Sequence, residues 1–529
     1  MKILLVLLQA LLLLSGAGTA EELDESELER YELLVFNPVC INLASANRLQ
    51  TCGLFSAYQV ASIQNYIREN GDILSATELA TVPGFTPELA TAMKQFISFE
   101  SYSASPSKHR HRLWQSFRIR DANGQIAGKY SLQYGEKMEL YLSHKQNLSA
   151  SLAVHGKRPW KLLAGDFNVR LGQGLLAWSG FSMSGVSTVG SFRRNASGVS
   201  PTGSFSPSHR GLAADYCGRI WKTGAALDSR GSLIAFGAWQ GHSSAIGINC
   251  ISGAGSTGFS ADASLNAGHF FFFGEAAWCN APAALVGAIW EPAYKTAFSL
   301  LARYYSPGYA AFSAGAVRSG SKVRDEAAIS AGISWKWLDC TADMSVHPER
   351  IALRKSNYQQ FKSVINASPS FVWNRWQFSP AVRWVERMQL SPSENGYNAS
   401  WKHDFRTDLK ASRGPLQGCL RLNALKNADS RTGGLAYLEL GYKTASDTAR
   451  FQVSVYLRGT VCDIPDWASR IYCYERDLPG CFTVPAWYGQ KRSVSFITGL
   501  SFRTRKCRQR LYFRASTNDI KLQYQIWFW

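Results

Sequence analysis

The sequence predicts a mainly β protein, a large antiparallel transmembrane β-barrel of about 16–18 strands preceded by a small all-α domain. Three observations lead to this fold class. Residues 1–20 have the form of a secretory signal, and no later run of about 18 apolar residues offers a transmembrane helix. From Leu113 to the end of the chain, apolar and polar residues alternate with a period of two. Any insertion into a membrane must therefore be made by strands.

The signal has the usual three parts. Lys2 precedes an apolar run from Ile3 to Leu14, and the small residues Gly18-Thr19-Ala20 form a cleavage site. The mature chain is therefore expected to begin at Glu21, and because no cysteine stands at the cleavage site, we expect no lipoprotein anchor. We divide the chain into the signal (1–20), an acidic helical domain (21–107) and the barrel (108–529).

The last strand, residues 520–529, carries the alternation most clearly. Such a strand would leave a sticky edge in an open sheet, and pairing with the first strand of a closed barrel removes that edge. We therefore predict that it closes the barrel and faces outer-membrane lipid. Its apolar face consists of Ile520, Leu522, Tyr524, Ile526 and Phe528, and its polar face of Lys521, Gln523 and Gln525.

The polar face of other predicted strands is rich in arginine. In a soluble sheet that face would be the outer surface, but in a membrane barrel it lines the lumen, which would make the lumen cationic. Two Gly-, Ser- or Cys-containing interruptions, 178–208 and 459–491, predict long loops, and the first is long enough to fold inward. The arginines predicted to face the lumen are Arg375, Arg383, Arg450, Arg458, Arg508, Arg510 and Arg514.

Charge divides the chain into an acidic head and a basic body. The whole chain has a formal net charge of +19, yet residues 21–100 hold twelve acidic and four basic residues, a net charge of −8. The barrel region is correspondingly more basic than the total suggests. A short tether, residues 101–107, joins the two parts and spans at most roughly 25 Å.

Two short helical units occupy the head. The first runs from Ile41 through Gly53-Leu54 into a helix that ends near Gly71, and the second follows about thirty residues later. In the second, Ser75 is a predicted N-cap, and Thr86 caps a helix with Pro87 at its first position.

These units resemble tandem helix-hairpin-helix motifs, as found in competence DNA receptors of the ComEA type. The resemblance implies that backbone N–H groups of the turns contact DNA phosphates. However, each turn keeps only the first glycine of the usual Gly-Ile-Gly, and the net negative charge repels polyanions. We therefore favour a periplasmic protein contact or a plugging role, with DNA binding as the alternative. The residues that would contact phosphate are Gly53, Leu54, Gly84, Phe85 and Thr86.

The amino-acid sequence of the barrel region is similar to that of a bacterial outer-membrane family that joins helix-hairpin-helix repeats to a C-terminal barrel. The resemblance implies a Gram-negative outer membrane, a helical domain in the periplasm, and contact with lipid and with the barrel-assembly machinery. It implies no activity. We expect Gly172 and Gly174 to permit a bend or close packing in a strand, and Trp178 and Phe181 to lie at the membrane interface. The matching segments are 165–175, 178–181, 209–213, 469–475 and 485–489.

No motif points to catalysis, a metal or a cofactor. The eleven cysteines show no Cys-x-x-Cys spacing, and the sequence shows no recognisable Ser-His-Asp grouping or phosphate loop. The sequence does not decide whether Cys40 bonds to Cys52, or whether two of Cys462, Cys473 and Cys481 form a disulfide. We expect no enzymatic activity, no metal and no cofactor.

The leading functional hypothesis is a porin-like or envelope-assembly component of the outer membrane. The alternative is a surface protein that handles DNA with the helical domain and a cationic lumen. We further predict that the acidic head, through Glu21 to Glu32, docks at the periplasmic mouth and restricts passage. The sequence leaves open the oligomeric state and whether the lumen conducts.

Overall fold

The computed structural model describes most of the barrel and most of the helical domain. The predicted signal (1–20), most of the acidic segment and the tether (101–107) lie outside the described residues. The described residues are 34, 38–44, 49, 52, 54–55, 57–99 and 113–528, except 135–136, 157–159, 181–184, 195, 219, 242, 254, 294–295, 356–357, 394–395, 428–431, 445–449, 468, 482 and 518.

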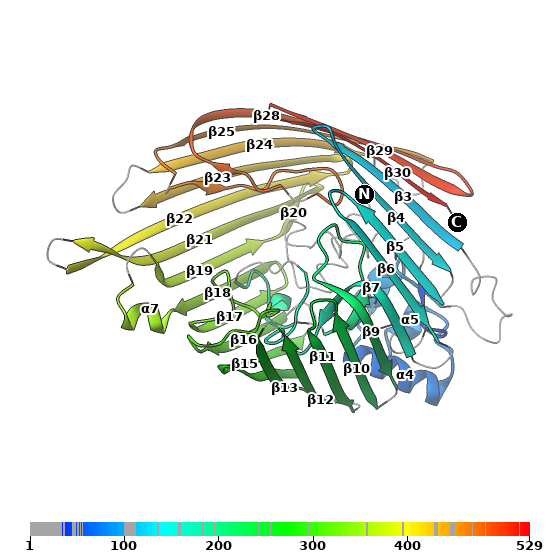
Figure 1. Cartoon of the computed structure of the whole chain (residues 1–529). Helices are drawn as coiled ribbons and strands as arrows, with labels where there is room; N and C mark the ends of the chain where they lie inside the picture. Colours follow the sequence, from blue (N-terminus) through cyan, green and yellow to red (C-terminus); the bar gives the residue numbers. More distant parts are fainter. Residues whose placement is uncertain are drawn as a thin grey trace.

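The barrel is a single closed antiparallel sheet with 24 full strands in the part of the chain that the structure describes (Figure 1). It closes where β30 pairs with both β29 and β3, with Phe528 opposite Gln115. The strands are β3 (Leu113–Ala122), β4 (Gln125–Tyr134), β5 (Met138–His144), β6 (Leu148–His155), β7 (Trp160–Arg170), β9 (His209–Cys217), β10 (Trp221–Asp228), β11 (Leu233–Gln240), β12 (Ser244–Gly253), β13 (Ser256–Ala267), β14 (Phe270–Cys279), β15 (Ala281–Ala293), β16 (Thr296–Tyr305), β17 (Glu326–Trp335), β18 (Leu338–Val346), β19 (Gln359–Pro369), β21 (Trp376–Ser393), β22 (Gly396–Arg413), β23 (Leu416–Asn427), β24 (Gly433–Lys443), β25 (Phe451–Ile464), β28 (Gly489–Arg503), β29 (Cys507–Ser516) and β30 (Ile520–Phe528).

The predicted count of about 16–18 strands was wrong. Several hairpins are joined by one or two residues in the left-handed conformation, such as Asn123-Gly124 between β3 and β4 and Asn280 between β14 and β15. So short a turn leaves no polar stretch between the two strands. The sequence pattern therefore merged pairs of strands into one.

The two ends of the barrel differ in loop length. At the end where β3 begins and β30 finishes, called the terminal end here, the turns are short, and 444–450 is the longest. The opposite end, the loop end, carries the long connections 171–208, 306–325, 347–358 and 465–488. Outer-membrane barrels combine short periplasmic turns with long external loops in this way.

The outer surface of the barrel is apolar. Along β13 to β17 every second residue points outward, and large apolar side chains such as Trp278 and Val286 are more than half exposed on this face. On β30 the outward residues are Ile520, Leu522, Tyr524 and Phe528, whereas Gln523 and Gln525 are buried on the inner face. A closed barrel with such a surface is suited to lipid.

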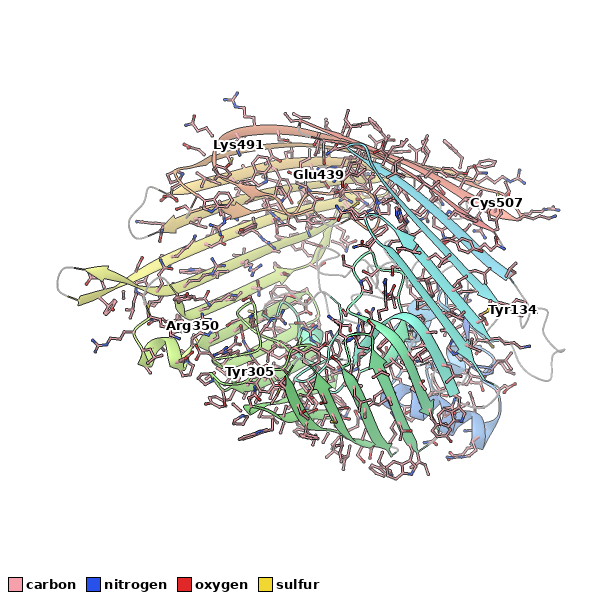
Figure 2. All side chains as sticks on the ribbon, viewed as in Figure 1. Tyr134, Tyr305, Arg350, Glu439, Lys491 and Cys507 are labelled. Atoms are coloured by element: carbon pink, nitrogen blue, oxygen red, sulfur yellow. The ribbon has the colours of Figure 1, made fainter. Side chains whose placement is uncertain are left out.

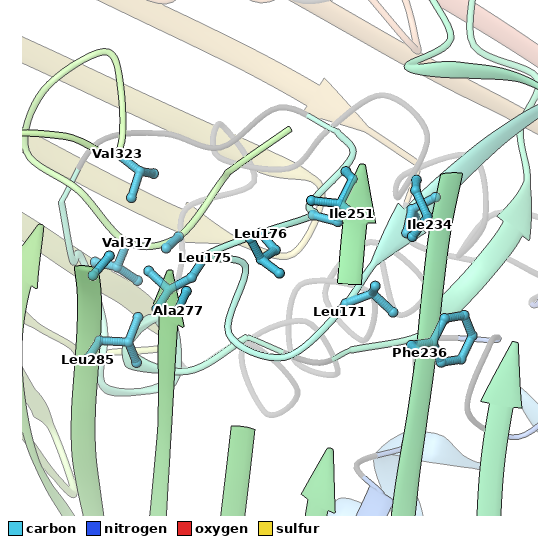
Figure 3. Close-up of a cluster of buried hydrophobic side chains, with 14 of the residues drawn as sticks. Leu171, Leu175, Leu176, Ile234, Phe236, Ile251, Ala277, Leu285, Val317 and Val323 are labelled. Carbon is cyan, nitrogen blue, oxygen red and sulfur yellow. The ribbon is translucent and has the colours of Figure 1, made fainter. Parts of the chain in front are cut away.

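The largest apolar core lies inside the barrel, between the strands and the long loops. It joins inward side chains of β6 to β16 to residues from 171–199 and 309–323 (Figure 3). Figure 3 labels Leu175 and Leu176 from the first loop, Val317 from the second, and Phe236 and Leu285 from the strands. The long connections of the loop end contain the short elements η3 (Val189–Phe192), β8 (Gly198–Pro201), α7 (Pro348–Ala352), β26 (Ile471–Tyr472) and β27 (Ala486–Trp487). At the terminal end, β20 (Phe371–Trp373) lies between β19 and β21 and pairs with β21.

The helical domain has its own apolar core. Its elements are β1 (Val39–Cys40), α4 (Ala57–Asn70), α5 (Ala76–Leu79), α6 (Pro87–Met93) and β2 (Ile97–Ser98). The Ser75 and Thr86 side chains cap α5 and α6 as predicted. Such short helices do not by themselves establish a helix-hairpin-helix fold. No helix among the described residues is long and apolar enough to cross a membrane.

Candidate functional site: the lumen and its inward-folded loops

The first inner loop, residues 171–208, is built around a buried carboxylate. The Glu275 side chain, on β14, accepts hydrogen bonds from the backbone N–H groups of Gln173 (2.7 Å) and Leu175 (3.0 Å). Gly172 has φ +52°, and a Cβ there would lie 2.7 Å from the carboxyl carbon of Glu275. Gly172 and Gly174 therefore allow a tight turn around Glu275. They lie in the loop after β7, so their expected place within a strand was wrong.

The second inner loop, residues 306–325, is joined to the first by backbone bonds. Gly315 N–H donates to the Gly174 carbonyl (2.9 Å), and Trp178 N–H donates to the Ser313 carbonyl (2.8 Å). The Trp178 ring lies 5.5 Å from the guanidinium groups of Arg170 and Arg194. Trp178 is therefore inside the barrel, and its expected place at the membrane interface was wrong. Phe181 lies outside the described residues.

His209 links the second inner loop to the barrel wall. Its Nδ1 lies 2.9 Å from Asp228 Oδ2, and its Nε2 lies 3.3 Å from Ser313 Oγ. These three residues have the connectivity of a Ser-His-Asp grouping, which the sequence could not reveal because 104 positions separate His209 from Ser313. The imidazole is buried and stacks on Phe167. The Ser313 carbonyl also accepts a hydrogen bond from the first inner loop. We therefore interpret the three residues as a structural contact that holds the second inner loop against the barrel wall.

The third inner loop, residues 465–488, is held mainly by charge. Arg514, on β29, lies 2.6 Å from Glu475 and 2.7 Å from Asp519. Lys521 lies 2.7 Å from Asp477. Burial raises the pKa of the Glu475 carboxyl.

A second cluster of charges anchors the same loop to the nearby strands β24 and β25. Glu439 pairs with Arg458 of β25 at 2.7 Å and with Arg476 of the loop at 2.8 Å. Figure 2 labels Glu439 on the strands at the top of the view. Arg120, on β3, donates to the carbonyls of Pro479 and Gly480. The loop is thus tied to strands on both sides of the barrel closure.

The predicted lumen arginines fall into two groups. Arg458, Arg508 and Arg514 are buried on the inner face, where Arg508 donates to Ser501 and Gln452. Arg383 and Arg510 are partly buried on the same face, and Arg510 stacks on Trp527 at 4.9 Å. The other two, Arg375 and Arg450, are exposed in turns at the terminal end, directly before β21 and β25. The prediction had continued the alternating pattern into residues that precede those two strands.

A small cavity of about 50 Å³ opens on the inner wall near the barrel closure. Arg118 and Lys129, which are opposite each other on β3 and β4, supply its positive charge. Lys129 Nζ lies 4.3 Å from the Phe205 ring of the first inner loop. The alternating Arg118-Ile119-Arg120 could have revealed this site. The lining residues are Ser116, Phe117, Arg118, Lys129, Tyr130, Ser131, Tyr141, Leu142, Gly203, Gln525 and Trp527.

The residues proposed to contact DNA phosphate do not form one exposed surface. Leu54 and Phe85 are buried in the helical core, and the Phe85 N–H donates to the Val82 carbonyl. Thr86 Oγ1 accepts from the Leu89 N–H and so caps α6. Gly84 is exposed with φ +90°, and Gly53 lies outside the described residues.

No group of three or more His, Cys, Asp or Glu residues is placed to hold a metal ion within the described part of the chain. Of the cysteines considered for disulfides, Cys40, Cys52, Cys462 and Cys473 are buried. The contacts within the lumen are therefore made by hydrogen bonds, ion pairs and apolar packing.

Comparison of the sequence with protein-family models and with curated proteins finds no match. Among solved structures, OpdL of Pseudomonas aeruginosa aligns at 7% identity over 79% of this chain and 96% of that chain, with a TM-score of 0.31. A BenF-like porin from Pseudomonas fluorescens Pf-5 aligns at 7% identity over 79% and 97%, with a TM-score of 0.30. The translocation pore of the P pilus usher PapC aligns at 9% identity over 79% and 98%, with a TM-score of 0.33. Because these scores are low, the assignment of a closed barrel depends on the strand pairing of this chain.

Proposed function

We propose that this protein is an outer-membrane barrel whose restricted lumen admits small anions in preference to cations. The observation that carries the proposal is the cavity beside the barrel closure, into which Arg118 and Lys129 face. The inner loops occupy much of the remaining interior, so the cations act across a narrow space. A confined passage with low-dielectric walls strengthens their attraction for an anion.

Three features support placement in the outer membrane of a Gram-negative cell. The barrel is closed, its outer face is apolar, and its long connections gather at the loop end. We infer that the terminal end and the helical domain lie in the periplasm, because short turns belong on that side. The β30 strand must pair with β3 to complete the sheet, so the barrel-assembly machinery is the expected partner for insertion.

The test is the reversal potential of the full chain in planar bilayers under a KCl gradient. We expect small conductance and a potential of the sign that indicates chloride preference. The double change Arg118→Gln and Lys129→Gln should lower that preference, whereas Lys426→Gln, on the exposed far end of β23, should not. Cation preference in the unaltered protein, or no conductance in any condition, would refute the proposal.

We also propose that the helical domain is a periplasmic protein contact, with DNA binding as the competing hypothesis. The Phe85 N–H, one of the backbone donors that a phosphate would need, donates instead to the Val82 carbonyl, and this supports the former. Counterion release requires that DNA affinity fall steeply with salt. Residues 21–105 should therefore be titrated with duplex DNA, beginning at about 50 mM salt. Salt-dependent binding would favour the DNA hypothesis.

A further inference from the structure

An arc of basic residues follows the terminal end of the barrel from β20 to β29. Exposed arginines from four successive turns contribute to it, including the two that the sequence had assigned to the lumen. In sequence, these turns and the strand ends that enter them hold seven basic residues and a single acid, Asp447, so the arc is strongly positive. The basic residues are Arg375, Arg413, Lys443, Arg450, Arg503, Arg505 and Lys506.

The arc differs from the other turns at this end in its extent. In sequence, Lys336 in the turn after β17 has Asp339 close by, and Lys157 and Arg158 form an isolated basic pair between β6 and β7. Between β20 and β29, by contrast, basic residues recur in four successive turns.

Aromatic side chains lie on the outward face beside the arc. Phe371 of β20 stacks on Phe378 of β21 with ring centroids 5.5 Å apart, and Trp373 is 69% exposed. The guanidinium of Arg413 lies 5.9 Å from the ring of Trp376. Outward aromatic residues also end the neighbouring strands, namely Tyr442, Phe451, Phe502 and Phe528.

The aromatic residues set the depth of the arc in the membrane. Trp and Tyr concentrate at the level of lipid headgroups, where one part of the ring is in hydrocarbon and the other in water. Cations directly beside them at the strand ends are consequently level with lipid phosphates. At physiological ionic strength, charges within about 8 Å are only partly screened. Guanidinium groups can also bind phosphate oxygens through two hydrogen bonds.

We propose that this arc binds anionic phospholipid headgroups in the membrane leaflet at the terminal end. The partner is a phospholipid with net negative charge, held through its phosphate by the arginines and through its acyl chains by the adjacent aromatic face. Such a contact would fix the depth and tilt of this side of the barrel.

The experiment uses the full chain in nanodiscs made of equal parts phosphatidylglycerol and phosphatidylcholine. The lipids that remain bound after gentle detergent release are counted by native mass spectrometry. The test variant carries Arg413→Gln, Arg450→Gln and Arg505→Gln. A matched control removes three cations near the loop end, Lys426→Gln, Lys491→Gln and Arg492→Gln, and heat-modifiable gel mobility verifies that each barrel is folded.

We expect the unaltered protein to retain phosphatidylglycerol over phosphatidylcholine at least threefold. The arc variant should lose most of this preference, and the loop-end control should keep it. Equal retention by the unaltered protein and the arc variant would overturn the proposal, as would an equal loss in both variants. Preference that emerges only after residues 21–105 are deleted would also overturn it, because the acidic head would then be the occupant of the arc.

Discussion

Replacing Arg514 by Met should release the third inner loop from the barrel wall. Arg514 is 1% exposed and contacts Glu475 and Asp519 at 2.6–2.7 Å, with Asp477 3.6 Å away. Removing one partner of a buried ion pair costs about 3–5 kcal/mol, because the other charge remains unpaired. Lys521 stays near Asp477 and Asp519, and these contacts are partly hydrated, so we expect the lower end of this range.

A cost of about 3 kcal/mol corresponds to roughly a 100-fold change in the docking equilibrium. Cys473 reports the change, since it lies in the loop and is 2% exposed. Its labelling by a maleimide, followed by mass spectrometry, should become about 100-fold faster if labelling tracks the population of the open loop. The single-channel conductance should rise as well.

The control variant neutralises the two carboxylates that Arg514→Met leaves unpaired. Adding Glu475→Gln and Asp519→Asn to Arg514→Met removes the unpaired carboxylates, so the labelling rate should fall back toward that of the unaltered protein. If Arg514→Met labels Cys473 no more than twofold faster while its barrel stays folded, the ion pairs do not hold the loop and the reasoning is incorrect.

Three further outcomes are expected. Gly172→Ala should lower the free energy of unfolding in urea by about 2 kcal/mol more than Gly124→Ala does. Both glycines have a left-handed backbone, but only a methyl group at position 172 would displace the hydrogen-bonded Glu275 side chain. Equal effects of the two substitutions would contradict this. Tyr309→Phe should cost about 1–3 kcal/mol by leaving the Leu175 carbonyl without its hydroxyl donor, whereas Tyr304→Phe, on the lipid face, should cost almost nothing in the same urea titration. Burial lowers the pKa of His347, so its contribution to docking of the 347–358 loop is complete above a pH of about 6.5 and is lost as pH falls through the depressed value. The protection factors of the α7 amides, which are corrected for the intrinsic pH dependence of exchange, should therefore fall between pH 7.5 and 5, and His347→Gln should abolish this fall. The same fall in that variant would exclude His347 as its cause.

The fold class was predictable because alternation is a local property. In a strand of a closed barrel, one face meets lipid and the other meets the interior, so each residue of 520–528 is restricted by its own surroundings. The caps at Ser75 and Thr86 are local in the same sense, since each side chain bonds an N–H three residues ahead. Such features require no knowledge of distant parts of the chain.

The contents of the lumen were not predictable in this way. Trp178 looks in sequence like an interfacial aromatic residue, and only the folded barrel places it between Arg170 and Arg194. Arg375 and Arg450 follow the alternation of lumen residues, yet β21 and β25 begin only after them. An alternating pattern specifies a face only as far as the backbone pairing continues.

The sequence alone was enough to predict a strand-rich chain with an apolar outer face and a closing strand. The tertiary structure decided the number of strands, the loops that fill the lumen, and the contacts of Glu275, His209 and Arg514. The physical reason is distance along the chain. His209 and Ser313 are 104 positions apart, and Glu275 meets Leu175 across 100, so their hydrogen bonds exist only after the barrel has brought the loops and the wall together.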